Sequence, residues 1–224
     1  MYKYTKKHQA GFTLIEIAIV MVIIGLLLGG VLKGQAMIDS AKVRSLNSNI
    51  DGISAAWFAF QDRYRVFPGD MLAANANAQI GAGVGAGNGG DGGGTVVVGA
   101  ESGFLWRHLA VAGLISGSYS ALTTGAAGVV QDCAVTICPD NRFGLGFVIA
   151  NLAAPFPAAA HRLFTGSRIP VEIVAELDRK IDDGLPATGT VFAGGGGAAA
   201  LCVAAGVYNI AGADQDCGLA IDNL

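Results

Sequence analysis

An uninterrupted apolar segment near the start of the chain constrains the fold more than any other feature of the sequence. Between Phe12 and Leu32 the only ionisable side chain is Glu16. The segment therefore has about the length of roughly 20 residues that an α-helix needs to cross a membrane. Residues 1–11, which precede it, contain three lysines and no acidic residue, and such basic flanks stay on the cytoplasmic side. The sequence predicts one membrane-spanning helix with the following domain on the far side.

The residues around the start of this helix resemble a processing signal. Residues 11–16 read GFTLIE, follow the short Lys-rich leader and open the apolar run. This arrangement is similar to the class III signal of type IV prepilins and type II secretion pseudopilins, which a membrane aspartic peptidase cuts after the Gly and then methylates at the new amine. The resemblance implies cleavage between Gly11 and Phe12, N-methylation of Phe12, and an assembly role for Glu16. A secretory signal peptide would instead be cut behind its apolar run.

Glu16 carries a charge into the apolar helix. A carboxylate costs about 2.5–3.5 kcal/mol at a membrane-helix centre, and less near the interface, so it needs a partner. Cleavage would create a cationic amine at Phe12, and opposite charges in a low dielectric offset each other's burial only if they meet. A contact between the Phe12 amine of one subunit and Glu16 of another would set their axial register. The alternative is an interfacial Glu in a simple anchor.

The apolar helix is predicted to continue beyond the membrane in an amphipathic half that ends near residue 64. A Pro-Gly pair at positions 68 and 69 supplies the turn that ends it. We expect the apolar face of this half to dock the helix on a globular domain, and a self-associating coiled coil is the alternative. The face consists of residues spaced by three and four: Val43, Leu46, Ile50, Ile53, Trp57, Phe60 and Tyr64.

The remaining chain predicts a single α+β domain, in which a small antiparallel β-sheet packs against the long helix. Short apolar or β-branched segments are separated by Gly, Pro, Asp and Asn. Residues 104–115 are predicted as a helix, and strands are predicted over 129–137, 143–152, 169–177 (or the start of a helix), 190–193 and 201–208. The expected organisation is a leader at 1–11, a transmembrane half at 12–32, an amphipathic half at 33–64 and a globular domain at 65–224, with a Gly-rich surface loop at 81–94.

Four cysteines lie in the second half of the chain: Cys133, Cys138, Cys202 and Cys217. Their even number in a chain that carries an export signal favours disulfides over zinc, since no Cys-x-x-Cys pair occurs. Three pairings are possible, and we expect the two sequential ones because each brackets a local turn. The second would resemble the C-terminal disulfide-bounded loop of many type IV pilins.

Other functions have little support in the sequence. The formal net charge of −3 makes the chain a poor nucleic-acid binder. His108 and His161 lie in no recognisable metal or catalytic motif, so we predict no catalytic residue, no cofactor and no metal. The phrase Asp182-Asp183-Gly184 reads as a helix-ending turn, with a calcium site as its alternative.

The expected function is therefore that of a structural subunit in a type IV pilus-like filament, homo-oligomeric and assembled through the N-terminal helix. The resemblance implies prepilin peptidase, other pilin or pseudopilin subunits and an inner-membrane assembly platform as partners. It also implies a single-pass inner-membrane protein with a periplasmic domain, and an extracellular filament after assembly. The alternatives are a type II secretion pseudopilin, a membrane-tethered enzyme and a DNA-binding minor pilin.

The processing signal yields the first prediction. In cells that contain a prepilin peptidase, the mature protein begins at Phe12 and carries a methylated amine. Intact-protein mass spectrometry of the membrane fraction measures both properties. A chain that still starts at Met1, or one cut behind the apolar run, would contradict the interpretation.

Overall fold

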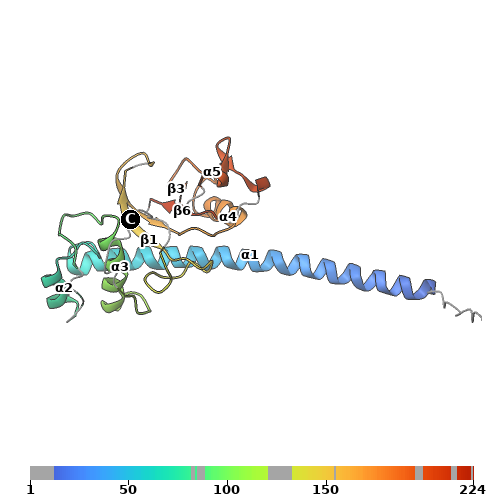
Figure 1. The fold of residues 1–224 in the computed structure, drawn as a ribbon, viewed down its shortest axis with the longest axis horizontal. Coiled ribbons are helices and arrows are strands. Elements are labelled where there is room, and N and C mark those ends of the chain that lie inside the picture. The colour runs from blue at the N-terminus through green and yellow to red at the C-terminus, as the bar shows by residue number, and fades with distance from the viewer. Residues whose placement is uncertain are drawn as a thin grey trace, which may run out of the picture. The chain divides into compact units, whose positions relative to one another are not determined.

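The computed structural model describes residues 13–81, 84, 89–120, 133–153, 155–194, 199–212, 216–222 and 224. The chain divides into two compact units, one up to Ala41 and one from Lys42 to Leu224. The boundary falls inside the first helix, α1 (Leu14–Tyr64), which is the longest element of the fold (Figure 1). Gly11 and Phe12, the predicted cleavage and methylation positions, lie outside the described residues.

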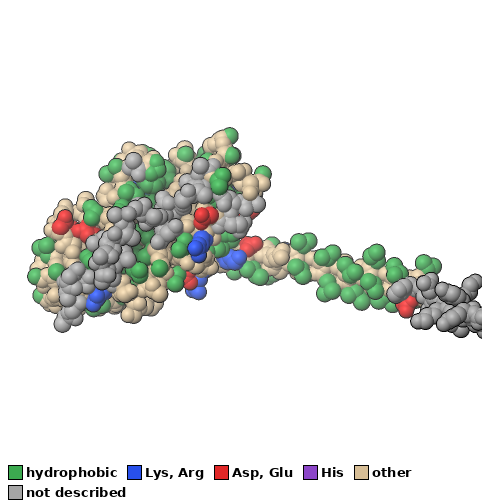
Figure 2. Space-filling model, in the orientation of Figure 1, with side chains coloured by type: hydrophobic (Ala, Val, Ile, Leu, Met, Phe, Trp, Pro, Cys, Tyr) green, Lys and Arg blue, Asp and Glu red, His purple; other side chains and the backbone are tan. Residues whose placement is uncertain are grey.

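The first half of α1 has no buried residue: every described position up to Ala41 is exposed or partly exposed. Figure 2 shows hydrophobic side chains covering this part of the helix. Its large apolar side chains are between 46% exposed, at Ile24, and 93% exposed, at Leu14. By length and composition α1 is able to cross a membrane. Its 51 residues correspond to roughly 77 Å at 1.5 Å per residue, so the helix is far longer than a bilayer requires.

The second half of α1 forms one side of the core of the globular unit. The apolar face identified in the sequence coincides with its buried residues, and Tyr64 at its end is partly buried. Trp57 stacks on Phe67 with ring centroids 5.2 Å apart. The face is therefore covered within the same chain. Its buried apolar members are Val43, Leu46, Ile50, Ile53, Ala56, Trp57 and Phe60.

The sheet of the globular unit is antiparallel throughout, with the strand order β1-β2-β6-β3. Alternate residues face opposite sides, as the pleat requires: Ile149 and Leu163 join the core that contains the α1 face, whereas Val148 and Phe164 join a smaller cluster. A separate two-stranded sheet pairs β4 with β5. The strands are β1 (Val148–Leu152), β2 (Ala160–Phe164), β3 (Val191–Ala193), β4 (Val203–Ala204), β5 (Val207–Tyr208) and β6 (Leu219–Ile221).

The α+β class predicted from the sequence is confirmed, with several corrections to its elements. The helix predicted over 104–115 begins and ends earlier, as α3 (Ala100–Val111), and the helical alternative given for 169–177 holds from Val171 onward. Of the strand predicted over 129–137, the structure describes residues 133–137: Cys133 makes an isolated bridge with Gly146, and residues 135–137 form a turn. The helices after α1 are α2 (Ala73–Gln79), α3 (Ala100–Val111), α4 (Val171–Ile181) and α5 (Ala199–Cys202), followed by the 3-10 helix η1 (Ile210–Gly212).

Both sequential disulfides are present in the structure, Cys133–Cys138 and Cys202–Cys217. The second joins the end of α5 to the segment before β6. Cys217 also exchanges two backbone hydrogen bonds with Ile169, at 3.0 and 3.1 Å between nitrogen and oxygen. The C-terminal segment is thus held by a covalent link and by backbone pairing.

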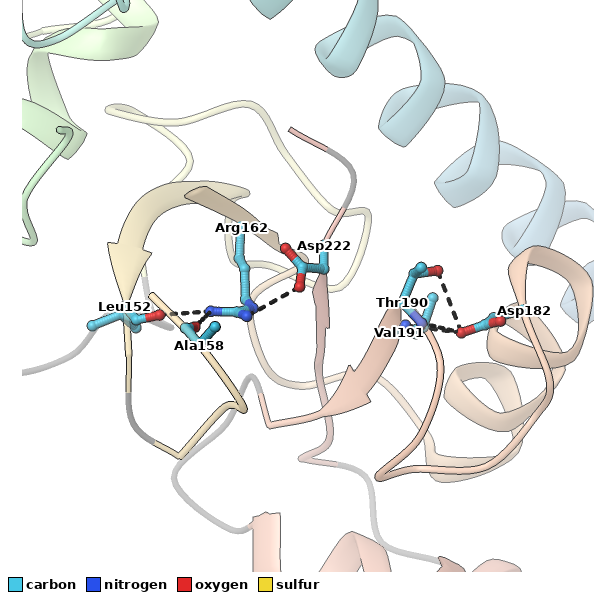
Figure 3. A network of polar contacts seen from close by, with 7 residues as sticks. All are labelled: Leu152, Ala158, Arg162, Asp182, Thr190, Val191 and Asp222. Atoms are coloured by element: carbon cyan, nitrogen blue, oxygen red, sulfur yellow. Dashed lines mark hydrogen bonds and ion pairs between the residues drawn. The ribbon is translucent and has the colours of Figure 1, made fainter. Parts of the chain in front are cut away.

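A buried arginine ties the last strand to the rest of the sheet (Figure 3). Arg162 on β2 is 1% exposed and pairs with Asp222, just after β6, at 3.0 Å. Its Nη1 donates to the carbonyls of Leu152 and Ala158, at 2.6 and 3.0 Å. The guanidinium also lies over the ring of Phe156, 4.4 Å from its centroid. The charge is thus compensated from three directions, as a buried cation requires.

This network predicts that Arg162→Ala lowers the free energy of unfolding by roughly 2–4 kcal/mol, since it removes a buried cation that binds two carbonyls and the partly exposed Asp222. The matched control is Arg65→Ala, whose partner Asp62 lies on the surface and whose loss costs at most about 1 kcal/mol. Denaturant unfolding of the full-length chain in detergent measures both, because the fluorescent Trp57 and Trp106 are buried in the globular unit. Equal losses in the two variants would contradict the network's role.

Candidate functional site

The start of α1 is held by a reciprocal pair of polar residues. The Oε2 atom of Glu16 accepts hydrogen bonds from the backbone N–H and the hydroxyl of Thr13, both at 2.8 Å. The Thr13 hydroxyl in turn accepts from the backbone N–H of Glu16, at 3.3 Å. This is the capping-box arrangement, in which the residue before the helix and the third helical residue satisfy each other's free N–H groups.

The capping box refines the role predicted for Glu16. From the sequence, its carboxylate is expected to need a partner from another subunit, but Thr13 already supplies two donors within the chain. Two neutral donors leave the negative charge in place. The spacing Thr-x-x-Glu at the head of an apolar run is a capping-box signature, so this signal was present in the sequence and was missed.

The surface of α1 beyond Glu16 is both apolar and open. Gly25 and Gly29 are four residues apart, as are Gly30 and Gly34, and none of the four interrupts the helix. A methyl group added at any of these positions would meet no atom within 4 Å. Small residues at this spacing let two helix backbones approach closely in membranes. The first half of α1 therefore presents small residues on an apolar surface that the described part of the chain leaves uncovered.

Both histidines of the globular unit serve its packing. Nδ1 of His108 on α3 accepts from the backbone N–H of Gly69 at 3.0 Å, and His108 is fully buried. Nε2 of His161 accepts from the N–H of Val96 at 2.9 Å. His161 lies on β2. Each imidazole thus satisfies a backbone amide.

The carboxylates at the end of α4 form a hydrogen-bonded turn. Asp182 accepts from the backbone N–H groups of Thr190 and Val191 at the start of β3 (Figure 3). Asp183 accepts from the N–H of Leu185 at 2.8 Å and from the hydroxyl of Thr188 at 2.6 Å. These bonds fasten the loop after α4 to β3, which supports the interpretation of Asp182-Asp183-Gly184 as a turn.

A third carboxylate in this region is buried. Asp178 is fully buried on α4, and its two oxygens accept from the hydroxyl of Tyr208 at 2.6 Å and from the N–H of Gly184 at 3.3 Å. Burial raises the pKa of Asp178, while the hydroxyl of Tyr208 acts in the opposite direction by stabilising the charged form. Although Asp178, Asp182 and Asp183 converge within 4.8 Å, each of the three carboxylates already accepts hydrogen bonds from the protein.

Comparison with known proteins supports the N-terminal motif. Residues 6–32 match the family model of the prokaryotic N-terminal methylation motif, which is the signature of type IV pilins and pseudopilins. No curated protein and no solved structure matches the chain. The match confirms the resemblance inferred from GFTLIE and supports a pilin-like or pseudopilin protein. It covers part of the predicted leader and the apolar start of α1, and it ends before the globular unit.

The pair of Asp178 and Tyr208 predicts a pH-dependent loss of stability in Tyr208→Phe. Because the pKa of Asp178 is higher in the folded state than in the unfolded state, the protein is most stable when this carboxyl is protonated. The free energy of unfolding therefore falls as pH rises through that pKa. Without the hydroxyl the pKa of Asp178 rises further. We expect the deficit in unfolding free energy to grow from under about 1.5 kcal/mol near pH 4 to roughly 1.5–3 kcal/mol at pH 7.

Denaturant titrations of the full-length chain at the two pH values measure this change. Tyr119→Phe is the matched control, since its hydroxyl donates to the backbone carbonyl of Ser116 and to no carboxylate. The account is wrong if the Tyr208→Phe deficit is the same at both pH values.

Proposed function

We propose that this chain is a structural subunit of a type IV pilus-like filament, processed by a prepilin peptidase and assembled through α1. One observation carries the proposal: the methylation motif at residues 6–32 leads into a 51-residue helix with two different halves. The half up to Ala41 has no buried residue, whereas the half from Lys42 to Tyr64 supplies part of the domain core. A simple membrane anchor requires no such second half.

The exposed apolar half needs a cover at each stage of the subunit's life. Exposed apolar surface disfavours the aqueous state by roughly 25 cal/mol for each Å². In the precursor and the mature monomer, the inner membrane would cover it, with the globular unit in the periplasm. In the filament, the corresponding helices of other subunits would replace the lipid, and the glycines from Gly25 to Gly34 would allow their close approach.

Glu16 and the new amine would fix the register of this packing. The capping box holds the Glu16 carboxylate at the first turn of α1, where the helix dipole also favours a negative charge. Cleavage after Gly11 would place the methylated amine of Phe12 at the adjoining chain end. The carboxylate keeps its charge, because its two donors from Thr13, one hydroxyl and one backbone N–H, are neutral. The amine of one subunit would then neutralise the carboxylate of another.

A pseudopilin of a type II secretion system is the second candidate, because the same motif marks both classes. The disulfide Cys202–Cys217, which resembles the C-terminal loop of many pilins, favours a subunit exposed on a pilus. Catalysis has weaker support, since both histidines of the globular unit serve as acceptors for backbone amides. Filament subunits, the peptidase and an inner-membrane assembly platform are the partners that this function requires.

The proposal predicts that Glu16→Ala and Glu16→Gln still insert in the membrane, since removing a charge favours insertion. Cleavage is largely retained, and filament assembly or N-methylation is lost because the amine loses the charge that offsets its burial. Glu16→Asp rescues assembly only in part, since its side chain is one methylene shorter. The measurement is the filament yield in sheared surface fractions, counted by electron microscopy after membrane insertion and cleavage are verified.

Asp51→Ala is the matched control, because it removes an exposed carboxylate from the second half of the same helix. Its filament yield should equal that of the unaltered protein. Normal yield from Glu16→Ala, in cells where no other subunit supplies the filament core, would refute the register mechanism.

A further inference from the structure

Three carboxylates from separate segments meet beside the start of α3. Asp70 follows the turn after α1, Asp91 belongs to the Gly-rich segment, and Glu101 lies in the first turn of α3. One oxygen from each lies within 4.8 Å of the others. Asp70 and Glu101 are only 3% and 5% exposed, whereas Asp91 is exposed. The cluster thus has two buried carboxylates and one that faces solvent.

Glycines bring the three segments together. The backbone N–H of Gly90 donates to the carbonyl of Met71 at 2.9 Å, and that of Gly92 donates to the carbonyl of Asp70 at 3.0 Å. A Cβ atom at Gly90 would overlap the backbone of Asp70. Within the surface loop predicted over 81–94, residues 91–94 are exposed. Residues 89–94 follow a defined path against the turn after α1, which fixes the position of Asp91.

The turn that carries Asp70 also requires a glycine. Gly69 has a φ of +95°, in the region that favours glycine, and a Cβ atom there would overlap the carbonyl of Glu101. The turn therefore packs directly on the first turn of α3. This close approach places the Asp70 and Glu101 carboxylates in one cluster.

Most oxygens of the cluster accept hydrogen bonds, and one buried oxygen does not. Oδ2 of Asp70 accepts from the N–H of Gly94 at 2.9 Å. The two oxygens of Glu101 accept from the N–H groups of Asp91 at 3.0 Å and Val97 at 2.8 Å. Oδ1 of Asp70 is buried and has no hydrogen-bond partner among the described residues. An unsatisfied buried carboxylate oxygen is costly, and it points to a missing positive ligand.

The described residues supply no compensating charge to this cluster. Two ion pairs between described residues, Arg65 with Asp62 and Arg162 with Asp222, do not involve the cluster. His161 lies close enough to Asp70 for their charges to interact, but burial lowers its pKa, and its Nε2 is occupied as an acceptor. Burial raises the pKa of Glu101, and the carboxylates of Asp91 and Asp70 add to that effect by repulsion.

We propose that Asp70, Asp91 and Glu101 bind a divalent cation, with calcium preferred. Carboxylate oxygens are the ligands that calcium takes, at about 2.3–2.6 Å from the ion, and its flexible geometry suits oxygens that come from loops. Oxygens within 4.8 Å of one another fit around one ion of that size. The exposed side, at Asp91, leaves room for the waters that complete the coordination. Magnesium binds more weakly because it demands a smaller, octahedral set of ligands.

The bound ion would join the turn after α1, the Gly-rich segment and α3. The second acidic cluster, at Asp178, Asp182 and Asp183, has no buried oxygen without a hydrogen-bond partner among the described residues. The proposal is independent of filament assembly, and its failure would leave the proposed function unaffected.

Isothermal titration of calcium chloride into the metal-stripped, full-length chain in detergent tests the proposal. We expect one saturable site, with a dissociation constant no weaker than the roughly 10⁻⁴–10⁻³ M of extracellular calcium modules. Calcium should also raise the thermal midpoint of the globular unit by several degrees, reversibly with chelator. Asp91→Asn should weaken calcium binding at least tenfold without lowering the thermal midpoint of the metal-free protein, because Asn retains an acceptor for the N–H of Gly93.

Two control variants remove a carboxylate elsewhere. Asp62→Asn, on exposed α1 surface, and Asp183→Asn, in the second acidic cluster, should bind calcium as the unaltered chain does. The proposal is overturned if no saturable binding occurs at calcium concentrations up to about 10⁻² M, ten times the weakest dissociation constant expected. It is equally overturned if Asp183→Asn abolishes binding while Asp91→Asn retains it.

Discussion

The structure depends on one constraint: a single continuous helix carries two apolar surfaces that need different covers. The surface between Lys42 and Tyr64 is covered by the chain's own sheet and helices. The surface up to Ala41 is left uncovered in the single chain. Because that surface is too apolar for water, the protein has to reside in a membrane or associate through this segment. This division and the methylation motif together support the proposed role as a filament subunit.

Polar side chains can fix the relative positions of elements that apolar packing alone leaves undetermined. Apolar contact alone does not fix the axial position of one helix relative to another. In the proposed filament, the single charge of Glu16 at the start of α1 would fix it. In the globular unit, Arg162 performs a comparable task for the sheet, since it ties β2 to the segment after β6 through Asp222. The disulfide Cys202–Cys217 holds the same C-terminal region. An ion pair and a disulfide thus reinforce the pairing of the short strands, of three to five residues, in the four-stranded sheet.

The sequence predicted the long helix, the face that it buries and the α+β class, because these depend on periodicity over many residues. It did not predict β2 or β6. The strand β2 contains His161 and Arg162, whose burial depends on partners from distant segments, and β6 is only three residues long. The cluster of Asp70, Asp91 and Glu101 was missed for a similar reason. Its members are brought together by close backbone approaches at Gly69 and Gly90, which a one-dimensional pattern does not reveal.

The most direct test of the central claim is a helical reconstruction, by electron cryomicroscopy, of filaments sheared from cells that express this chain. The account predicts that residues 14–38 lie in a lipid-free core between neighbouring subunits. It also predicts that the Glu16 carboxylate lies within about 4 Å of the methylated amine of a neighbour's Phe12. The account would be contradicted by a filament in which these residues stay exposed to solvent, or in which Glu16 faces away from every neighbouring amine.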